Sequence, residues 1–190
     1  MRRIIREIYV NRVLGHELGF KRGTAALFFA GFHISLSIWI SIKKKVYYEL
    51  RDILVRFGEI TDELEKYHIL YLELAYKKGM RKIKVEISTG EHSYEYEIKD
   101  LYGLSCKVMR PEYMFTRILI ALTRRKQIAS SDLFDINYFL KEDWAIAEDP
   151  IRHELALTVS EYLTEVSGFI KDNSGLKIKL VLLYGLGCYF

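Results

Sequence analysis

Residues 20–42 read FKRGTAALFFAGFHISLSIWISI and form the least polar run of the chain. Over residues 34–42 every second residue is aliphatic, and Ser35 and Ser37 lie on the alternate positions. A period of two predicts a strand, because successive side chains of a strand point to opposite faces. The uncharged part of the run is long enough to cross a bilayer, but its interior serines lower its hydrophobicity and favour the strand. A short buried helix is expected before the strand, over residues 24–30.

The rest of the chain alternates between two periodicities. Apolar residues spaced by three or four predict helices over residues 3–18, 46–57, 111–125, 130–141 and 151–171. Further strands are expected over residues 67–76, 81–88, 93–98 and 104–109, while residues 176–184 are apolar and fit either a strand or a helix. Because the strands come early and the helices late, the pattern predicts an α+β fold.

Composition sets limits on the class of protein. Half of the 190 residues are hydrophobic and only two are proline, so the chain can bury a core and does not have a disordered composition. The net charge of +4 is compatible with nucleic acid or an acidic partner without requiring either. Cys106 and Cys188 are far apart and lack metal-ligand spacing. Together with the missing signal-peptide pattern, this predicts a cytoplasmic protein with no membrane span.

Two stretches resemble one known family. The first is FKRGTAAL (residues 20–27), followed by the strand that carries Ser35 and Ser37; the second is EYMFTRILIAL (residues 112–122), followed by SDLFDI (residues 131–136). Their order and approximate spacing resemble the AbiEii/AbiGii toxin family of nucleotidyltransferases. That family shows F-K-G-G-T-A-L, a strand with D-x-D, a helix with a lysine, and R-D-x-x-D at a helix start.

The resemblance implies a nucleotidyltransferase-like fold related to DNA polymerase beta. A mixed β-sheet with flanking helices is then expected over residues 1–110, with a helical C-terminal part over residues 111–190 packed on it. Family members use Mg²⁺ and a nucleoside triphosphate (NTP). Some add nucleotides to tRNA as toxins that a cognate antitoxin protein counters, so tRNA or another RNA and an antitoxin are the partners that the resemblance implies.

The resemblance also assigns residues to roles. Residues of the Gly-Thr turn would contact the nucleotide phosphates: Lys21, Arg22, Gly23 and Thr24. The two metal-binding aspartates of the family fall at Ser35 and Ser37, whose spacing of two places them on one strand face. Since Mg²⁺ prefers carboxylates and phosphates, this replacement predicts weak or lost metal binding.

Four charged residues complete the candidate catalytic set: Glu86, Arg117, Asp132 and Asp135. Glu86 falls where this fold carries a third strand carboxylate, and it is the one metal-binding acid retained. Arg117 takes the place of the family lysine, and Asp132 and Asp135 match the last motif, whose arginine is Ser131 here. Three of them also have a structural interpretation: Glu86 as an exposed strand glutamate, Asp132 as a helix cap and Asp135 as the partner of an arginine in an ion pair.

Three hypotheses about function follow. In the first, the protein keeps the fold and has lost or impaired transferase activity. In the second, it is an active nucleotidyltransferase that uses Glu86, Asp132 and Asp135. In the third, it binds a nucleotide, an RNA or a partner without reaction, through a cleft lined by cations such as Lys82, Lys84 and Arg117.

Overall fold

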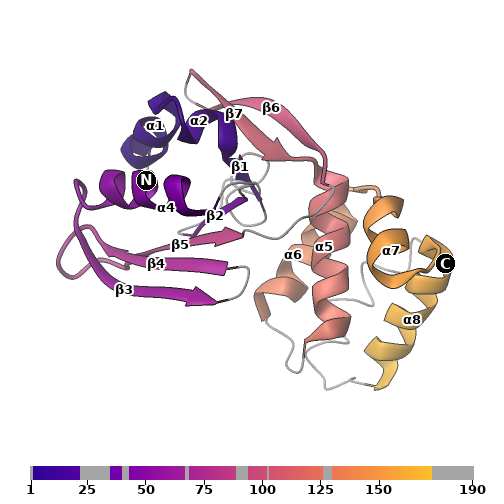
Figure 1. Ribbon diagram of the computed structural model, residues 1–190. Coiled ribbons are helices and arrows are strands. Elements are labelled where there is room, and N and C mark those ends of the chain that lie inside the picture. The colour runs from indigo at the N-terminus through magenta and orange to yellow at the C-terminus, as the bar shows by residue number, and fades with distance from the viewer. Residues whose placement is uncertain are drawn as a thin grey trace. The chain divides into compact units, whose positions relative to one another are not determined.

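The computed structural model describes residues 2–21, 35–39, 43–66, 69–88, 94–101, 103–125 and 130–172. The chain divides into two compact units, Met1–Met109 and Arg110–Phe190 (Figure 1). The first holds every strand of the described chain, and the second is helical. This arrangement confirms the predicted α+β class, with a mixed sheet followed by helices.

The first unit is built on a seven-stranded sheet with the order β3-β4-β5-β2-β1-β7-β6. Its strands are β1 (Gly19–Phe20), β2 (Ser35–Trp39), β3 (Glu59–Lys66), β4 (Ile69–Ala75), β5 (Ile83–Ser88), β6 (Tyr96–Leu101) and β7 (Leu104–Met109). The pairs β2–β5 and β1–β7 are parallel and the other four are antiparallel. The predicted strand with alternating serines thus lies at the centre of the sheet, between β5 and β1.

Helices α1 (Arg2–Val10), α2 (Leu14–Glu17) and α4 (Lys43–Leu54) lie against one face of this sheet (Figure 1). Ile4, Ile5 and Ile8 of α1 are buried, as are Leu72 and Val85 of the strands. Burial of an aliphatic side chain contributes about 1.5–3 kcal/mol, so this apolar layer is the main reason why the helices stay on the sheet. The opposite face of β4 and β5 carries the polar residues of both strands.

The single helix predicted over residues 3–18 is wrong, because the structure has two helices separated by a turn at Asn11. The side-chain oxygen of Asn11 accepts hydrogen bonds from the backbone N–H groups of Val13 and Leu14, at 2.9 and 3.0 Å. Asn competes with helical hydrogen bonding in this way, which periodicity alone does not register. The second helix leads directly into β1.

Two features of the sheet differ from the sequence-based prediction. Strand β3 was not predicted, because its acidic, exposed sequence EITDELEK has no apolar alternation; it is an edge strand paired only with β4. Gly19 was expected to end a helix and instead begins β1. A Cβ atom at Gly19 would lie 2.5 Å from the ring of Tyr96, so the sheet requires glycine there.

The second unit consists of α5 (Pro111–Arg124), α6 (Ser130–Lys141), α7 (Glu148–Leu155) and α8 (Val159–Asp172). Its core includes Phe115, Phe139, Ile151 and Tyr162. The ring of Phe139 stacks on that of Trp144 with centroids 4.3 Å apart. This aromatic core explains why the unit is compact in spite of its short helices.

One long helix over residues 151–171 was predicted, and this is also wrong. Helix α7 ends at Ala156, which has a left-handed backbone with φ of 56°. Thr158 then begins α8 with a capping box: Glu161 N–H donates to the Thr158 hydroxyl, and Thr158 N–H donates to the Glu161 carboxylate. The hydrogen bond from the Thr158 N–H is the largest cause of a lowered pKa of Glu161. A hydrogen bond from the Thr158 hydroxyl lowers this pKa further.

Two other sequence-based expectations, the helix over residues 24–30 and the element over residues 176–184, lie outside the described residues. Among the helices that the structure describes, none has the length and apolar character needed to cross a membrane.

Candidate functional site

The register of β2 and β5 gathers three of the candidate positions on one face of the sheet. Ser37 lies opposite Glu86, and Ser35 lies opposite Lys84. Residues opposite one another in neighbouring strands belong to the same face, so these four positions form one cluster. Ile83 and Val85 alternate with Lys84 and Glu86 and are buried on the helical side, which leaves Lys84 and Glu86 exposed.

Strand β4 extends this face by one more row. Tyr71 lies opposite Glu86, and Glu73 lies opposite Lys84. The Glu73 carboxylate is 2.7 Å from the Lys82 ammonium and accepts a hydrogen bond of 3.4 Å from the Tyr71 hydroxyl. The hydrogen bond from Lys82 lowers the pKa of Glu73, so this carboxylate carries its negative charge at neutral pH.

The pKa of Tyr71 is shifted in the other direction. Burial is the largest cause of the raised pKa of Tyr71, and the nearby carboxylates of Glu73, Asp62 and Glu86 raise this pKa further. These three acids lie near the Tyr71 hydroxyl, while Lys82 and Lys84 lie beside Glu73 on the same face. Tyr71 therefore stays protonated and can donate, but does not act as a base at neutral pH.

The chemistry of this face does not fit a catalytic divalent metal ion. Its four central positions are occupied by Ser35, Ser37, Glu86 and Lys84, whereas Mg²⁺ prefers several carboxylate or phosphate oxygens. Within the part of the chain that the structure describes, no group of three His, Cys, Asp or Glu side chains could hold a metal ion. Among these four positions, Glu86 supplies the one carboxylate.

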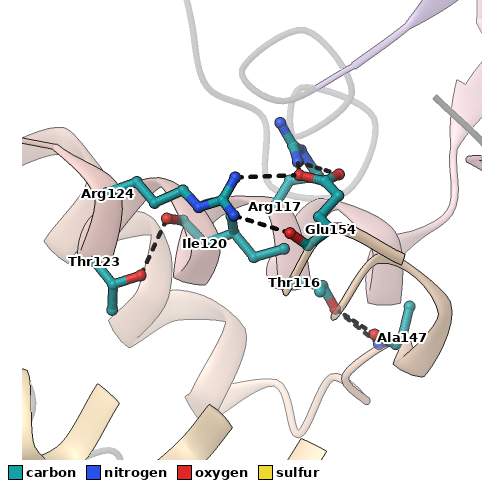
Figure 2. Close-up of polar contacts among 7 residues, drawn as sticks. All are labelled: Thr116, Arg117, Ile120, Thr123, Arg124, Ala147 and Glu154. Carbon is teal, nitrogen blue, oxygen red and sulfur yellow. Dashed lines mark hydrogen bonds and ion pairs between the residues drawn. The ribbon is translucent and has the colours of Figure 1, made fainter. Parts of the chain in front are cut away.

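Arg117 belongs to the helical unit, where it is engaged by another side chain. Its Nη1 donates to both oxygens of the Glu154 carboxylate, at 2.5 and 2.6 Å (Figure 2). Arg124, two turns further along α5, donates from Nη2 to the backbone oxygen of Glu154 at 3.0 Å. That oxygen belongs to the last turn of α7, where backbone acceptors lack helical partners. The contacts of Arg117 and Arg124 thus join α5 to the end of α7.

A second polar contact joins the same region to the segment before α7. The hydroxyl of Thr116 is fully buried, donates to the Glu112 backbone oxygen at 2.8 Å and accepts from the Ala147 N–H, also at 2.8 Å (Figure 2). A threonine in a helix interior can bond the carbonyl four residues earlier, and here its oxygen also satisfies a buried donor. These contacts give α5 a structural role in the helical unit.

The remaining candidate residues are divided between the two units. Asp132 and Asp135 lie on α6 of the helical unit, while Glu86 lies on the sheet of the first unit. Lys21 follows β1 directly and is half-buried. The other residues of the expected phosphate turn lie outside the described residues: Arg22, Gly23 and Thr24. Their role in nucleotide binding stays a prediction.

Sequence reasoning missed Tyr71, Glu73 and Glu154. For the first two a signal existed, since the segment LYLEL at residues 70–74 alternates between leucine and a polar or aromatic residue. Glu154 had no local signal, because its importance comes from the packing of α7 against α5.

The fold is similar to that of solved structures of nucleotidyltransferase type. A candidate nucleotidyltransferase of Helicobacter pylori matches with a TM-score of 0.57 at 18% identity, over 97% of this chain and 80% of that one. A second Helicobacter pylori protein, JHP933, matches with a TM-score of 0.57 at 19% identity, over 97% and 87%. An antigenic nucleotidyltransferase-like protein of Paracoccidioides brasiliensis matches with a TM-score of 0.51 at 13% identity, over 93% and 92%.

These similarities establish a nucleotidyltransferase-like fold over nearly the whole chain, as the sequence resemblance implied. At such low identity they concern the fold alone, because one fold can carry many functions. No protein-family model matches the chain, and a search of curated proteins finds no match.

Proposed function

We propose that this protein is an AbiEii-like member of a toxin–antitoxin system, acting in the cytoplasm, in which nucleotidyl transfer is impaired or lost. The observation that carries the proposal is the register of β2 and β5, in which Ser37 lies opposite Glu86. The same register that is expected to align metal-binding carboxylates in an active enzyme here places Glu86 opposite Ser37 and Lys84 opposite Ser35.

The physical consequence of that replacement is large. A bound metal ion stabilises developing charge by several kcal/mol in phosphoryl chemistry, and each 1.4 kcal/mol is about a tenfold change in rate. Neutral hydroxyls supply no compensating negative charge, and Lys84 beside them adds a positive charge that opposes cation binding. The nucleotide, tRNA and antitoxin partners belong to the proposal through the resemblance of residues 20–42 and 112–136 to the toxin family.

The test is a gain of function. Purified protein is incubated with tRNA, Mg²⁺ and labelled NTPs, and incorporation is compared among wild type, the double variant Ser35→Asp with Ser37→Asp, and the double variant Ser35→Asn with Ser37→Asn. Mn²⁺ binding is measured in parallel by electron paramagnetic resonance. The aspartates should restore cation binding, whereas the asparagines, which match their size without charge, should not.

The proposal predicts that the wild type shows no incorporation. If the wild type transfers nucleotide and Glu86→Gln abolishes the transfer, the proposed loss of activity is wrong. If in addition Asp132→Asn and Asp135→Asn each abolish transfer, the protein is an active nucleotidyltransferase with a rearranged set of acids. If NTP binds with an affinity indifferent to Mg²⁺, the protein is a binding module.

A further inference from the structure

The positive charge of the first unit is concentrated on its helices. Residues 2–17 and 43–56, which contain α1, α2 and α4, hold nine Lys or Arg and four Asp or Glu, a net charge of +5. The net charge of the whole chain is +4, so the helical layer carries all of the excess. Residues 59–88, which contain β3, β4 and β5, hold six Lys or Arg and six Asp or Glu, a net charge of zero. The charge excess of the unit therefore belongs to its helical layer and not to these strands.

The cations point outward because the apolar residues of each helix are fixed on the sheet. In α1, Ile4, Ile5 and Ile8 are buried and the intervening Arg3 and Arg6 are exposed. In α4 the buried residues include Val46, Leu50 and Leu54, and its exposed side carries Lys45 and Tyr48, followed by Arg56 after the helix. The exposed acids of the same helices are Glu7 and Asp52, so the cations remain in excess. We call this side of the layer the basic helical surface; its cations and aromatic residue are Arg3, Arg6, Arg12, Lys45, Tyr48 and Arg56.

The two helices are held together, and the surface cations are not used to do so. The Asn11 side-chain amide, just after α1, donates to the Glu49 carboxylate of α4 at 3.1 Å. Arg51 of α4 pairs with Glu63 of β3 at 3.4 Å. Among the described residues, the contacts that fix the layer therefore use Asn11, Glu49 and Arg51 and leave the exposed cations available for a ligand.

We infer that the basic helical surface binds single-stranded RNA. Lys and Arg side chains neutralise the phosphates, which gives affinity without sequence specificity. Tyr48 is 59% exposed and lies one helical turn from Lys45, so an unpaired base can stack on its ring while the ammonium contacts a phosphate. A ring that projects from a convex helix does not have this access to bases stacked inside a duplex, which favours a single strand.

An anionic membrane is the other polyanion that such a surface would attract. Amphipathic helices that bind membranes insert an apolar face into the lipid. The apolar faces of α1 and α4 are instead buried in the protein core. The large exposed hydrophobic residues of the layer are Val10, Tyr48 and Val55, and they stand among exposed charged residues such as Arg6 and Asp52. These separate side chains do not form an apolar stripe that could insert, so the structure favours RNA over a lipid surface.

The experiment measures RNA binding without any transfer chemistry. Full-length protein is titrated into fluorescently labelled single-stranded RNA and into a duplex of the same length, at several salt concentrations, with anisotropy as the readout. Wild type should prefer the single strand and lose affinity as salt rises. The triple variant Arg3→Gln, Arg6→Gln, Lys45→Gln should reduce the slope of log K against log salt by about 2, since each single-strand phosphate contact contributes about 0.7.

A matched control removes three cations elsewhere in the same unit. Lys77, Lys78 and Arg81 are exposed around the turn between β4 and β5, and their replacement by Gln changes the net charge equally. This control variant should keep the slope of log K against log salt within about 1 of the wild-type value, because no contact with a phosphate is lost. In addition, Tyr48→Ala should weaken single-strand binding about tenfold, within the range for loss of one stacked base.

The inference is wrong if the wild type does not bind RNA, or if the surface variant and the control variant lose RNA affinity equally. It is also wrong if the protein binds vesicles containing phosphatidylserine and does not bind RNA. The inference takes RNA as a partner from the proposed function, but its outcome is separate. RNA binding can be absent while the Ser35 and Ser37 variants still restore metal binding. Conversely, RNA can bind while those variants restore no metal binding.

Discussion

The contact between Arg117 and Glu154 gives the sharpest test of what Arg117 does. If its main role is to join α5 to α7, replacing Arg117 with Met will destabilise the fold, and so will replacing Glu154 with Gln. If its role is instead to line a cleft that binds a nucleotide, as the third hypothesis holds, Arg117→Met will weaken nucleotide binding with little effect on stability. The two roles therefore predict different results from one variant.

The expected coupling free energy between Arg117 and Glu154 follows from the geometry of their contact and from their exposure to solvent. Nη1 of Arg117 donates to both carboxylate oxygens of Glu154, at 2.5 and 2.6 Å, and the side chains of Arg117 and Glu154 are 26% and 23% exposed. Hydrogen bonds to charged groups contribute about 1.5–3 kcal/mol, whereas exposed ion pairs contribute about 0–1 kcal/mol. Since both partners are partly screened by solvent, a coupling of about 1–2 kcal/mol is expected.

The assay is a double-mutant cycle. The free energy of unfolding in urea is measured for wild type, Arg117→Met, Glu154→Gln and the double variant, and the coupling is the deviation from additivity. For a chain of this size each kcal/mol also shifts Tm by about 2–4 °C. A coupling below about 0.3 kcal/mol, which is the usual error of additivity for independent sites, would refute the structural role.

Three further predictions concern the packing of each unit. Thr116→Val should cost about 1–3 kcal/mol in urea unfolding because it leaves the buried Ala147 N–H unpaired, whereas Thr116→Ser, which keeps the hydroxyl, should cost less. Burial raises the pKa of Tyr162 to about 12, so the stability that this phenol contributes is complete below its unfolded pKa of about 10 and is lost as the pH rises toward 12. Between pH 8 and pH 11 the free energy of unfolding should fall more for the wild type than for Tyr162→Phe. An equal fall for the two proteins would contradict this prediction. Gly19→Ala should destabilise by about 1–3 kcal/mol through overpacking against a tyrosine ring, while Gly168→Ala in open space on α8 should be neutral or stabilising; similar thermal shifts would show that the close approach is unimportant.

Much of the secondary structure could be predicted because its causes are local. The alternation over residues 34–42 predicted the strand now described as β2, and the alternation over residues 81–88 predicted β5. The apolar spacing over residues 111–125 predicted α5, which has Pro111 in its first turn, a favourable position for proline. In each case the local pattern and the tertiary environment favour the same structure, so the sequence alone was sufficient.

The errors have tertiary or side-chain causes that periodicity does not contain. Residues 151–171 have a continuous apolar stripe, yet Ala156 adopts a left-handed backbone and Thr158 caps a new helix. Strand β3 has no apolar pattern of its own and exists because β4 offers it backbone hydrogen bonds. Neither outcome can be read from side-chain spacing.

For the candidate site, the sequence by itself determined which groups are present: two serines at a spacing of two, an acid in a later strand and a cation on a later helix. Only the tertiary structure decided which of them meet. The parallel register of β2 and β5 brings Glu86 opposite Ser37, because strands distant in sequence are aligned by backbone hydrogen bonds. Helix packing in turn gives Arg117 a carboxylate partner, Glu154, 37 residues away along the chain.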